Sequence, residues 1–223
     1  MIFQTPFAMF DLTTFMQSMP LLGKAALTTV GVSLAGLVFG FFIGLAVCAS
    51  RLSPNRSISA IGAAYVFVFR GVPLLVQLLL VYYLLPFVGI NVPPLVAAVS
   101  AVSLCSAAYV AEILRGGFLS VPYGHIEAAR MLGMRAFATL WRIKVPQATR
   151  LTLPSLANEM VLLIKASSLI SVVGVAEVTR TAQNIAASTY RPLEAYLAAG
   201  LIYFVINGTL AAFAHLAEHR LHA

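Results

Sequence analysis

Long apolar runs separated by short polar segments are the feature that most restricts the fold of this chain. Each run has about 20 residues or more, the length that an α-helix needs to cross the hydrocarbon core of a bilayer. Only 9% of the 223 residues are charged and 61% are hydrophobic, whereas about a quarter of the residues of a soluble domain carry a charge. The sequence therefore predicts an all-α membrane protein with a single domain over residues 1–223. Five transmembrane helices are expected, at residues 25–49, 60–90, 95–114, 149–175 and 193–217.

The second apolar run is interrupted by Arg70, Gly71, Val72 and Pro73. Proline removes a backbone donor, and an arginine inside a membrane must reach water, a headgroup or a partner. Two arrangements remain open. Either Arg70 lies deep in the membrane beside a broken helix, or residues 58–69 lie at the membrane interface and the span begins near Val72.

The fourth run is less apolar than the others because it contains Pro154, Asn158, Glu159 and Lys165. Charged groups in a span are costly, so they usually face a cavity or a partner. Asn158 and Lys165 share a helical face, and Glu159 lies about 100° from Asn158 around the helix axis. A lone carboxylate such as Glu159 either relays protons, as in a secondary transporter, or is simply paired, for example with Lys165 of a neighbouring turn or chain.

The cations are distributed unevenly between the two sides of the predicted bundle. Of the 14 Lys and Arg residues, nine lie in the 51–57 loop, in the 115–150 region or at Arg220 in the tail. Only Lys24, Arg180 and Arg191 lie on the opposite side. Because loops rich in Lys and Arg stay in the cytoplasm, the sequence predicts an external N-terminus and a cytoplasmic C-terminus.

Several small residues and pairs predict contacts inside the bundle. Four glycines recur four or five residues apart, and they indicate either a face for close helix packing or the ordinary glycine content of membrane helices. These are Gly31, Gly36, Gly40 and Gly44. Glu112 and Arg115 are spaced to pair on one helix face. Cys48 and Cys105 lie in apolar runs and are expected to be small buried hydrophobes.

Other classes of function are poorly supported. No lysine lies in a Gly-x4-Gly-Lys frame, so the chain has no phosphate-binding loop of its own. His215 and His219 match a metalloprotease spacing, with His222 as a possible third ligand, but the polar last turn of a helix explains them, and no metal is expected. Cations placed at the ends of apolar runs exclude nucleic-acid binding. The first ten residues lack the charged region and cleavage site of a signal peptide.

Residues 121–147 form the longest amphipathic and cation-rich interval of the chain. A short apolar stripe at Ile126, Ala129 and Leu132 is followed by Gly133, which permits a sharp reversal of the chain. A second apolar patch follows at Phe137, Leu140 and Trp141, and Pro146 suits the first turn of the next helix. The interval therefore predicts two short helices on the cytoplasmic face. They serve either to dock a partner or to rest on anionic lipid.

Seven positions of this interval resemble the EAA loop of permease subunits in ABC importers. They are Glu127, Ala128 and Ala129, then Gly133, then Ile143, and finally Val145 and Pro146. Six of the seven agree, and Val145 stands where leucine is usual. Blocks at 69–77, 107–117, 153–159 and 165–169 are similar to the polar amino-acid permease branch, and the resemblance covers about residues 20–215.

This resemblance implies a type I importer permease fold with five transmembrane helices in a bacterial inner membrane. It implies three kinds of protein partner: a second permease copy or paralogue, a dimer of ABC ATPase subunits that binds ATP and Mg, and an external substrate-binding protein. The chain itself would be a translocation subunit without enzymatic activity or cofactor. It would carry a polar or charged amino acid, or an opine-like derivative, through a membrane whose lipid surrounds it.

The resemblance also implies which residues serve each step. Coupling to the ATPase is expected from Gly124, Glu127, Ala128, Ala129, Gly133, Ile143 and Pro146. The substrate path is expected to include Arg70, Gln77, Asn158, Glu159 and Lys165. His125 stands where the family commonly has Gln, and Ala166-Ser167 replaces a frequent Asp-Thr, which removes a carboxylate near the path. The competing class is an ion-driven secondary amino-acid transporter, which five spans without a visible internal repeat do not favour.

Overall fold

Helices form every regular element in residues 10–222, the part of the chain that the computed structural model describes. Side chains are described for residues 10–216. The α-helices are α1 (Leu12–Arg51), α2 (Arg56–Gly71), α3 (Leu74–Phe87), α4 (Pro94–Leu119), α5 (Tyr123–Met131), α6 (Ala136–Thr139), α7 (Val145–Ala166), α8 (Val178–Thr189) and α9 (Pro192–His222). A π-helix at Leu140–Lys144 precedes α7, and a 3-10 helix at Ser167–Val173 follows it. The predicted all-α class is confirmed.

Helix α1 extends well beyond the predicted run at 25–49. It begins at Leu12 because the carboxylate of Asp11 accepts a hydrogen bond from the Thr13 amide at 2.9 Å and caps the helix. The added turns contain threonine, glutamine and serine, which lowered their apparent hydropathy. They nevertheless pack against the C-terminal part of the chain, where Leu22 and Ala25 contact α8 and α9.

The second apolar run forms two helices with a sharp break between them. Both arrangements that the sequence left open include such a break, so the choice between them stays a prediction. Helices α2 and α3 meet at an angle of 102°. Because a residue before proline is driven out of the α region, Val72 is extended, with φ −97° and ψ 131°, and the helix stops there. Within residues 10–222, four helices are long and apolar enough to cross a membrane, or five if the bent pair counts as one span.

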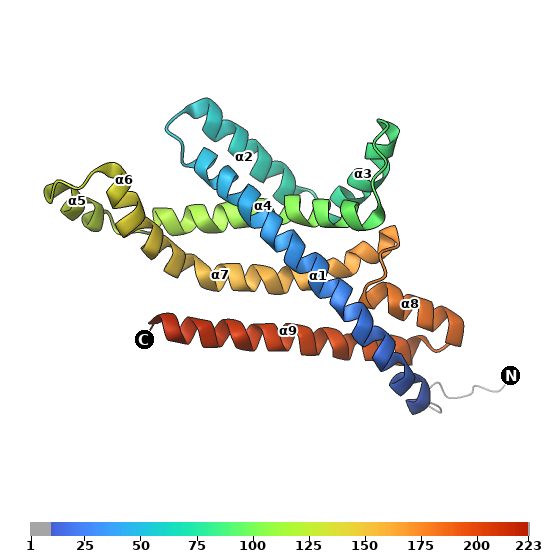
Figure 1. The fold of residues 1–223 in the computed structure, drawn as a ribbon. Helices are drawn as coiled ribbons and strands as arrows, with labels where there is room; N and C mark the ends of the chain where they lie inside the picture. The colour runs from blue at the N-terminus through green and yellow to red at the C-terminus, as the bar shows by residue number, and fades with distance from the viewer. Residues whose placement is uncertain (1–9, 223) are drawn as a thin grey trace.

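Helix α4 is the centre of the bundle, and α1 crosses it diagonally (Figure 1). The two helices approach closely because Gly36, Gly40 and Gly44 face α4. A Cβ atom at Gly44 would lie 2.9 Å from the carbonyl oxygen of Ala107. Gly31 has nothing within 4 Å of such an atom. Three of the four predicted glycines therefore form the packing face, and Gly31 does not belong to it.

Helices α4, α7 and α9 run side by side across the molecule, and their ends define two opposite faces (Figure 1). One face carries α5, α6 and the C-terminal end of α9, together with the end of α1 and the start of α2. The other carries α8, α3 and the start of α1. Cys48 and Cys105 are buried and free, as predicted. Residues 1–9, on which the signal-peptide prediction falls, lie outside the described part.

Candidate functional site

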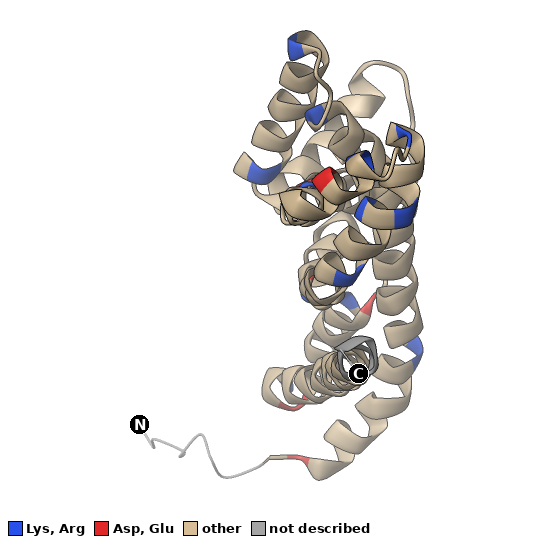
Figure 2. Ribbon diagram, turned by 90° about the vertical axis from the view of Figure 1, so that its left-hand side faces the viewer, with Lys and Arg blue, Asp and Glu red and all other residues tan. Residues whose placement is uncertain are grey.

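The short helices α5 and α6 form a projection at one end of the molecule. Figure 2 looks onto this end and shows Lys and Arg segments over the projection and the neighbouring helix ends. Arg51, Arg56 and Arg115 lie at helix ends on the same face as the cations of the 121–147 interval. The cations thus gather at one face, as the loop counts predicted.

The projection is shaped by a tight turn after α5. Gly133 has a φ of +69°, a left-handed conformation that favours glycine. The amide of Met134 then donates to the carbonyl of Ala129 at 3.0 Å, and that of Gly133 to the carbonyl of Arg130 at 2.9 Å. This geometry is a Schellman-type helix end. The predicted reversal at Gly133 is therefore present.

One face of α5 is tied to the rest of the protein. Ala129 is buried, and His125 Nδ1 lies 2.9 Å from Gln147 Oε1 at the start of α7. Gly124, Glu127 and Ala128 are exposed on the same short helix. The contact between His125 and Gln147 is exposed, and it joins α5 to the first turn of α7.

The apolar stripe at Ile126, Ala129 and Leu132 is only partly buried. Ala129 is buried, but Leu132 is 81% exposed because it follows the last turn of α5 and leaves the helical face. Met131 is 88% exposed beside it. The tip of the projection therefore presents two uncovered apolar side chains among cations.

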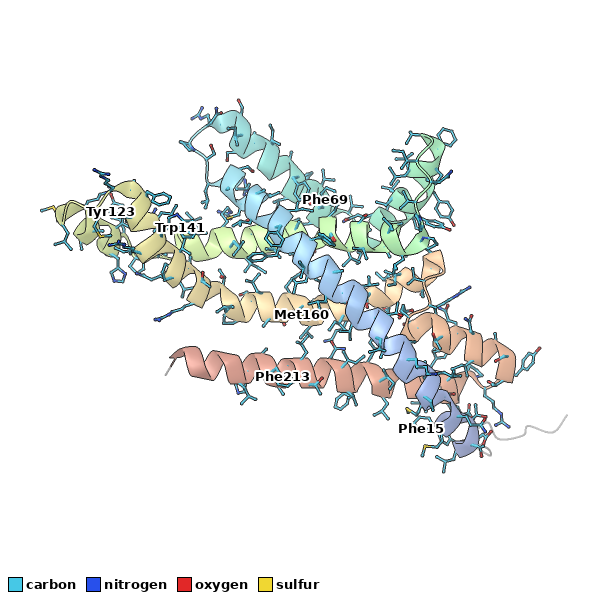
Figure 3. The ribbon with its side chains drawn as sticks, viewed as in Figure 1. Phe15, Phe69, Tyr123, Trp141, Met160 and Phe213 are labelled. Atoms are coloured by element: carbon cyan, nitrogen blue, oxygen red, sulfur yellow. The ribbon has the colours of Figure 1, made fainter. Side chains whose placement is uncertain are left out.

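The second apolar patch lies between the projection and α7, where Figure 3 shows Trp141. The rings of Phe137 and Trp141 are 6.2 Å apart. Ile143 is half-buried in the π-helix, and Pro146 lies in the first turn of α7, directly after that π-helix. These residues connect α6 to α7 as one continuous helical segment.

A charged cluster joins α1 to α4 at the same face. Glu112 Oε1 lies 3.2 Å from Arg51 Nε, and its Oε2 lies 2.7 Å from Arg115 Nη2. The predicted pair of Glu112 and Arg115 is confirmed, and Arg51 is an addition that sequence spacing along one helix did not reveal. The cluster holds the end of α1 against α4.

A cavity of about 610 Å³ with both polar and apolar lining residues lies between α2 and α4 and includes part of this cluster. It is lined by Arg51, Arg70, Tyr109 and Glu112, among others. The guanidinium carbon of Arg70 lies 5.1 Å from the centre of the Tyr109 ring, within the range of a cation–π interaction. Tyr109 lies in the 107–117 sequence block, but its contact with Arg70 could not be predicted from the sequence, because it depends on the packing of α2 on α4.

Helix α7 carries polar groups on two faces. Asn158 and Lys165 are exposed on the face toward α9, where they line two adjoining hollows of about 230 and 510 Å³ that share Val161 and Ala211. Glu159 is buried on another face, and the charge of Arg70 acts on its carboxylate. The predicted division of these residues between two helical faces is therefore present.

Gln77 differs from the other residues assigned to the path. It is 6% exposed, and its side-chain nitrogen donates to two backbone carbonyls at the break between α2 and α3. Its amide nitrogen is therefore directed toward the protein backbone. The five path residues thus occupy four places. Arg70 lines the α2–α4 cavity, Asn158 and Lys165 line the α7–α9 hollows, Gln77 lies at the helix break, and Glu159 is buried on another face of α7.

A second polar cluster lies at the opposite face of the molecule, and sequence reasoning missed it. The fully buried carboxylate of Glu177 caps α8 by accepting hydrogen bonds from the amides of Thr179 and Arg180 at 2.8 and 2.7 Å. The Tyr203 hydroxyl donates to it at 2.8 Å. Burial raises the pKa of Glu177, and these hydrogen bonds oppose that shift. The cluster links α8 to α9.

The C-terminal histidines do not add a metal site in the described part of the chain. Within the residues whose side chains are described, no group of three potential ligands is close enough to hold an ion. His215 lines a hollow between α7 and α9. The side chains of His219 and His222 lie outside the described residues.

Comparison with known proteins places these features in a family. Residues 36–223 match the family described as "Binding-protein-dependent transport system inner membrane component". The nopaline transport system permease protein NocM of Agrobacterium fabrum is 39% identical, over 93% of this chain and 90% of its own length. The glutamine transport system permease protein GlnP of Escherichia coli is 35% identical, over 95% of this chain and 98% of its own.

A solved structure agrees with the fold. The crystal structure of an amino acid ABC transporter with histidines contains a chain that is 37% identical to this one. The match covers 95% of this chain and 99% of that chain, with a TM-score of 0.91. The bundle is therefore the permease fold of type I ABC importers, which work with separate ATPase subunits and a substrate-binding protein. From its sequence, its fold and its relatives, this chain belongs to the family of binding-protein-dependent transport system inner membrane components, as the non-enzymatic permease subunit of an ABC importer.

Proposed function

We propose that this permease imports a polar or charged amino acid or an opine-like derivative. The relatives support this class because they are named for the transport of nopaline and of glutamine. These molecules carry at least one carboxylate, for which a cationic group inside the membrane is a suitable partner. The residues of the α2–α4 cavity provide such a group in Arg70.

The projection of α5 and α6 is the proposed coupling element. Its support is one observation: α5 is exposed at its Glu127 side and at its tip, and it is tied to α7 through His125 and Gln147. A partner ATPase, which binds the ATP and Mg, would take this projection into a groove on its surface. Closure of the two ATPases then moves α5, and α7 moves with it.

The proposed path runs from the external face to the α2–α4 cavity. Arg70 meets the substrate carboxylate, while Asn158, Glu159 and Lys165 line or brace the path along α7. Rocking of two permease halves, either two copies of this chain or this chain and a paralogue, opens the path to each side in turn. The N-terminus lies outside, because the cation-rich face that carries α5 is cytoplasmic.

The test of the coupling role is a charge reversal at Glu127 in the assembled transporter. Glu127→Arg places a cation against the groove that accepts the natural carboxylate, so substrate-stimulated ATP hydrolysis and uptake into proteoliposomes both fall. Arg56→Glu is the matched control, because Arg56 is exposed on the same face but lies at the start of α2. Unchanged substrate-stimulated hydrolysis in the Glu127→Arg transporter refutes the assignment.

The substrate path is tested separately through apparent affinity. Replacement of Arg70 by Gln removes the cation and raises the substrate concentration needed for half-maximal uptake. Replacement of Asn158 or Lys165 by a neutral apolar residue tests whether the α7–α9 face contributes. If none of these changes alters the half-saturating concentration, the path lies elsewhere.

A further inference from the structure

The break between α2 and α3 leaves backbone carbonyls without their usual donors. In a continuous helix, the amide of residue 73 would donate to the carbonyl of Phe69, but Pro73 has no amide hydrogen. Val72 is extended, so its own carbonyl also leaves the helical ladder. The last backbone hydrogen bond of α2 runs from the Val72 amide to the Val68 carbonyl, at 3.0 Å.

The side chain of Gln77 supplies the missing donors. Its Nε2 atom donates to the Phe69 carbonyl at 2.9 Å and to the Val72 carbonyl at 2.7 Å. Gln77 lies in the first turn of α3, so a side chain from one helix caps the end of the other. The Cys105 thiol on α4 adds a weaker contact to the Phe69 carbonyl, at 3.8 Å.

The two capped carbonyls lie on either side of Arg70. We propose that Gln77 is a positioning residue that closes the elbow at residues 69–77 and thereby holds Arg70 over Tyr109. Because Nε2 donates to the backbone and the side chain is 6% exposed, Gln77 acts through the elbow; its buried Oε1 atom has no hydrogen-bond partner within the described residues. Figure 3 shows Phe69 at the end of α2, where this helix meets α4.

The two hydrogen bonds of the Gln77 amide stabilise the elbow more in a membrane than they would in water. Buried carbonyls that lose a donor cannot turn to solvent in the hydrocarbon region, so each must find another partner inside the protein. Without the amide of Gln77, the Phe69 and Val72 carbonyls have lost their donors, so an elbow with a different angle between α2 and α3, in which other donors reach them, becomes more stable than the present one. Such a change moves Arg70, which lies within the elbow, away from the Tyr109 ring.

The experiment measures the elbow directly in the assembled transporter in lipid nanodiscs. Spin labels at Ile61→Cys on α2 and Tyr83→Cys on α3 occupy exposed positions, whereas native Cys48 and Cys105 are buried. Pulsed electron paramagnetic resonance then gives the distance distribution between the labels. Gln77→Met preserves length and flexibility but lacks the donors. Val76→Leu is the matched control, because Val76 is the adjacent residue and is exposed.

The expected result is a shifted or broadened distance distribution in Gln77→Met and an unchanged one in Val76→Leu. In a thermal unfolding assay, Gln77→Met should melt roughly 5 °C lower than the control. If Gln77→Met does not assemble, Gln77→Glu, which retains the length but loses the amide donors, is measured instead. A distance distribution equal to that of the control overturns the proposal.

The positioning of Arg70 by Gln77 rests on the proposed function, and it is measured separately, through the apparent affinity for substrate. Gln77→Met should raise the half-saturating substrate concentration about fivefold, which is the order expected when a cation–π contact is lost. A shifted elbow with unchanged half-saturation overturns the positioning of Arg70 by Gln77. If uptake by the unmodified transporter does not require ATP, the proposed function fails. The distance measurement still tests whether Gln77 holds the elbow, because it does not depend on transport.

Discussion

The close approach of α1 and α4 predicts opposite effects for the same substitution at two glycines of one helix. An alanine at Gly44 would place its Cβ atom 2.9 Å from the Ala107 carbonyl oxygen and 2.9 Å from the Val110 Cβ atom. The first of these neighbours is backbone, which cannot rotate away. An alanine at Gly31 would meet nothing within 4 Å. Gly31→Ala is therefore the control for the intrinsic effect of alanine on the helix.

The magnitudes follow from two competing terms. Replacement of glycine by alanine in a helix stabilises it by about 1 kcal/mol, and this is the whole effect at Gly31. At Gly44 the same gain is opposed by overpacking, which costs roughly 1–3 kcal/mol. The two variants should therefore differ by about 2 kcal/mol in unfolding free energy. For a chain of this size, that difference separates their melting temperatures by roughly 4–8 °C.

The assay uses the two cysteines as reporters. Cys48 and Cys105 are buried and free, so a thiol-reactive fluorophore labels them only as the purified protein unfolds in detergent. We expect Gly31→Ala to melt slightly above the unmodified protein and Gly44→Ala to melt below it. Equal melting temperatures for the two variants would show that α1 and α4 are not in contact through this glycine face.

Two other predictions concern the charged clusters at the opposite faces. Glu112→Gln removes the carboxylate that Arg51 and Arg115 share, which is partly shielded from solvent. In the same thermal assay we expect the free energy of unfolding to fall by about 1–2 kcal/mol. Arg51→Gln should lower it less, because Arg115 retains its partner, and a larger loss in Arg51→Gln than in Glu112→Gln would contradict the cluster. Glu177→Ala removes the cap of α8 and leaves the Thr179 and Arg180 amides without an acceptor, so we expect about 2–3 kcal/mol less protection against hydrogen exchange in α8. Arg180→Ala, which keeps the cap, should leave that protection unchanged, and equal exchange in the two variants would refute this role for Glu177.

The sequence predicted those features that depend on neighbours along the chain. Gly133 was expected to reverse the chain and has a positive φ, and Pro73 was expected to interrupt a helix and lies at a sharp break. In both cases the constraint is local, because it follows from the backbone freedom of one residue. Whether α2 lies inside the membrane or at its interface depends on the position of the bilayer, which these local constraints do not determine.

The features that the sequence did not predict depend on contacts between distant segments. Arg51 meets Glu112 and Arg70 meets Tyr109 only because α1 and α2 both pack on α4. Glu177 was not among the residues that the sequence singled out, yet it is fully buried. Its burial becomes apparent only when Tyr203 on α9 lies beside it.

The length of α1 has a mechanical consequence. Its 40 residues make a rod of about 60 Å, roughly twice the thickness of the hydrocarbon core. The rod contacts α8 and α9 near its first turns and is bound to Glu112 at its last residue. A tilt of about 5° around one end moves the other by about 5 Å, close to one helical turn. α1 can thus act as a lever that converts small rotations at one membrane face into displacements at the other.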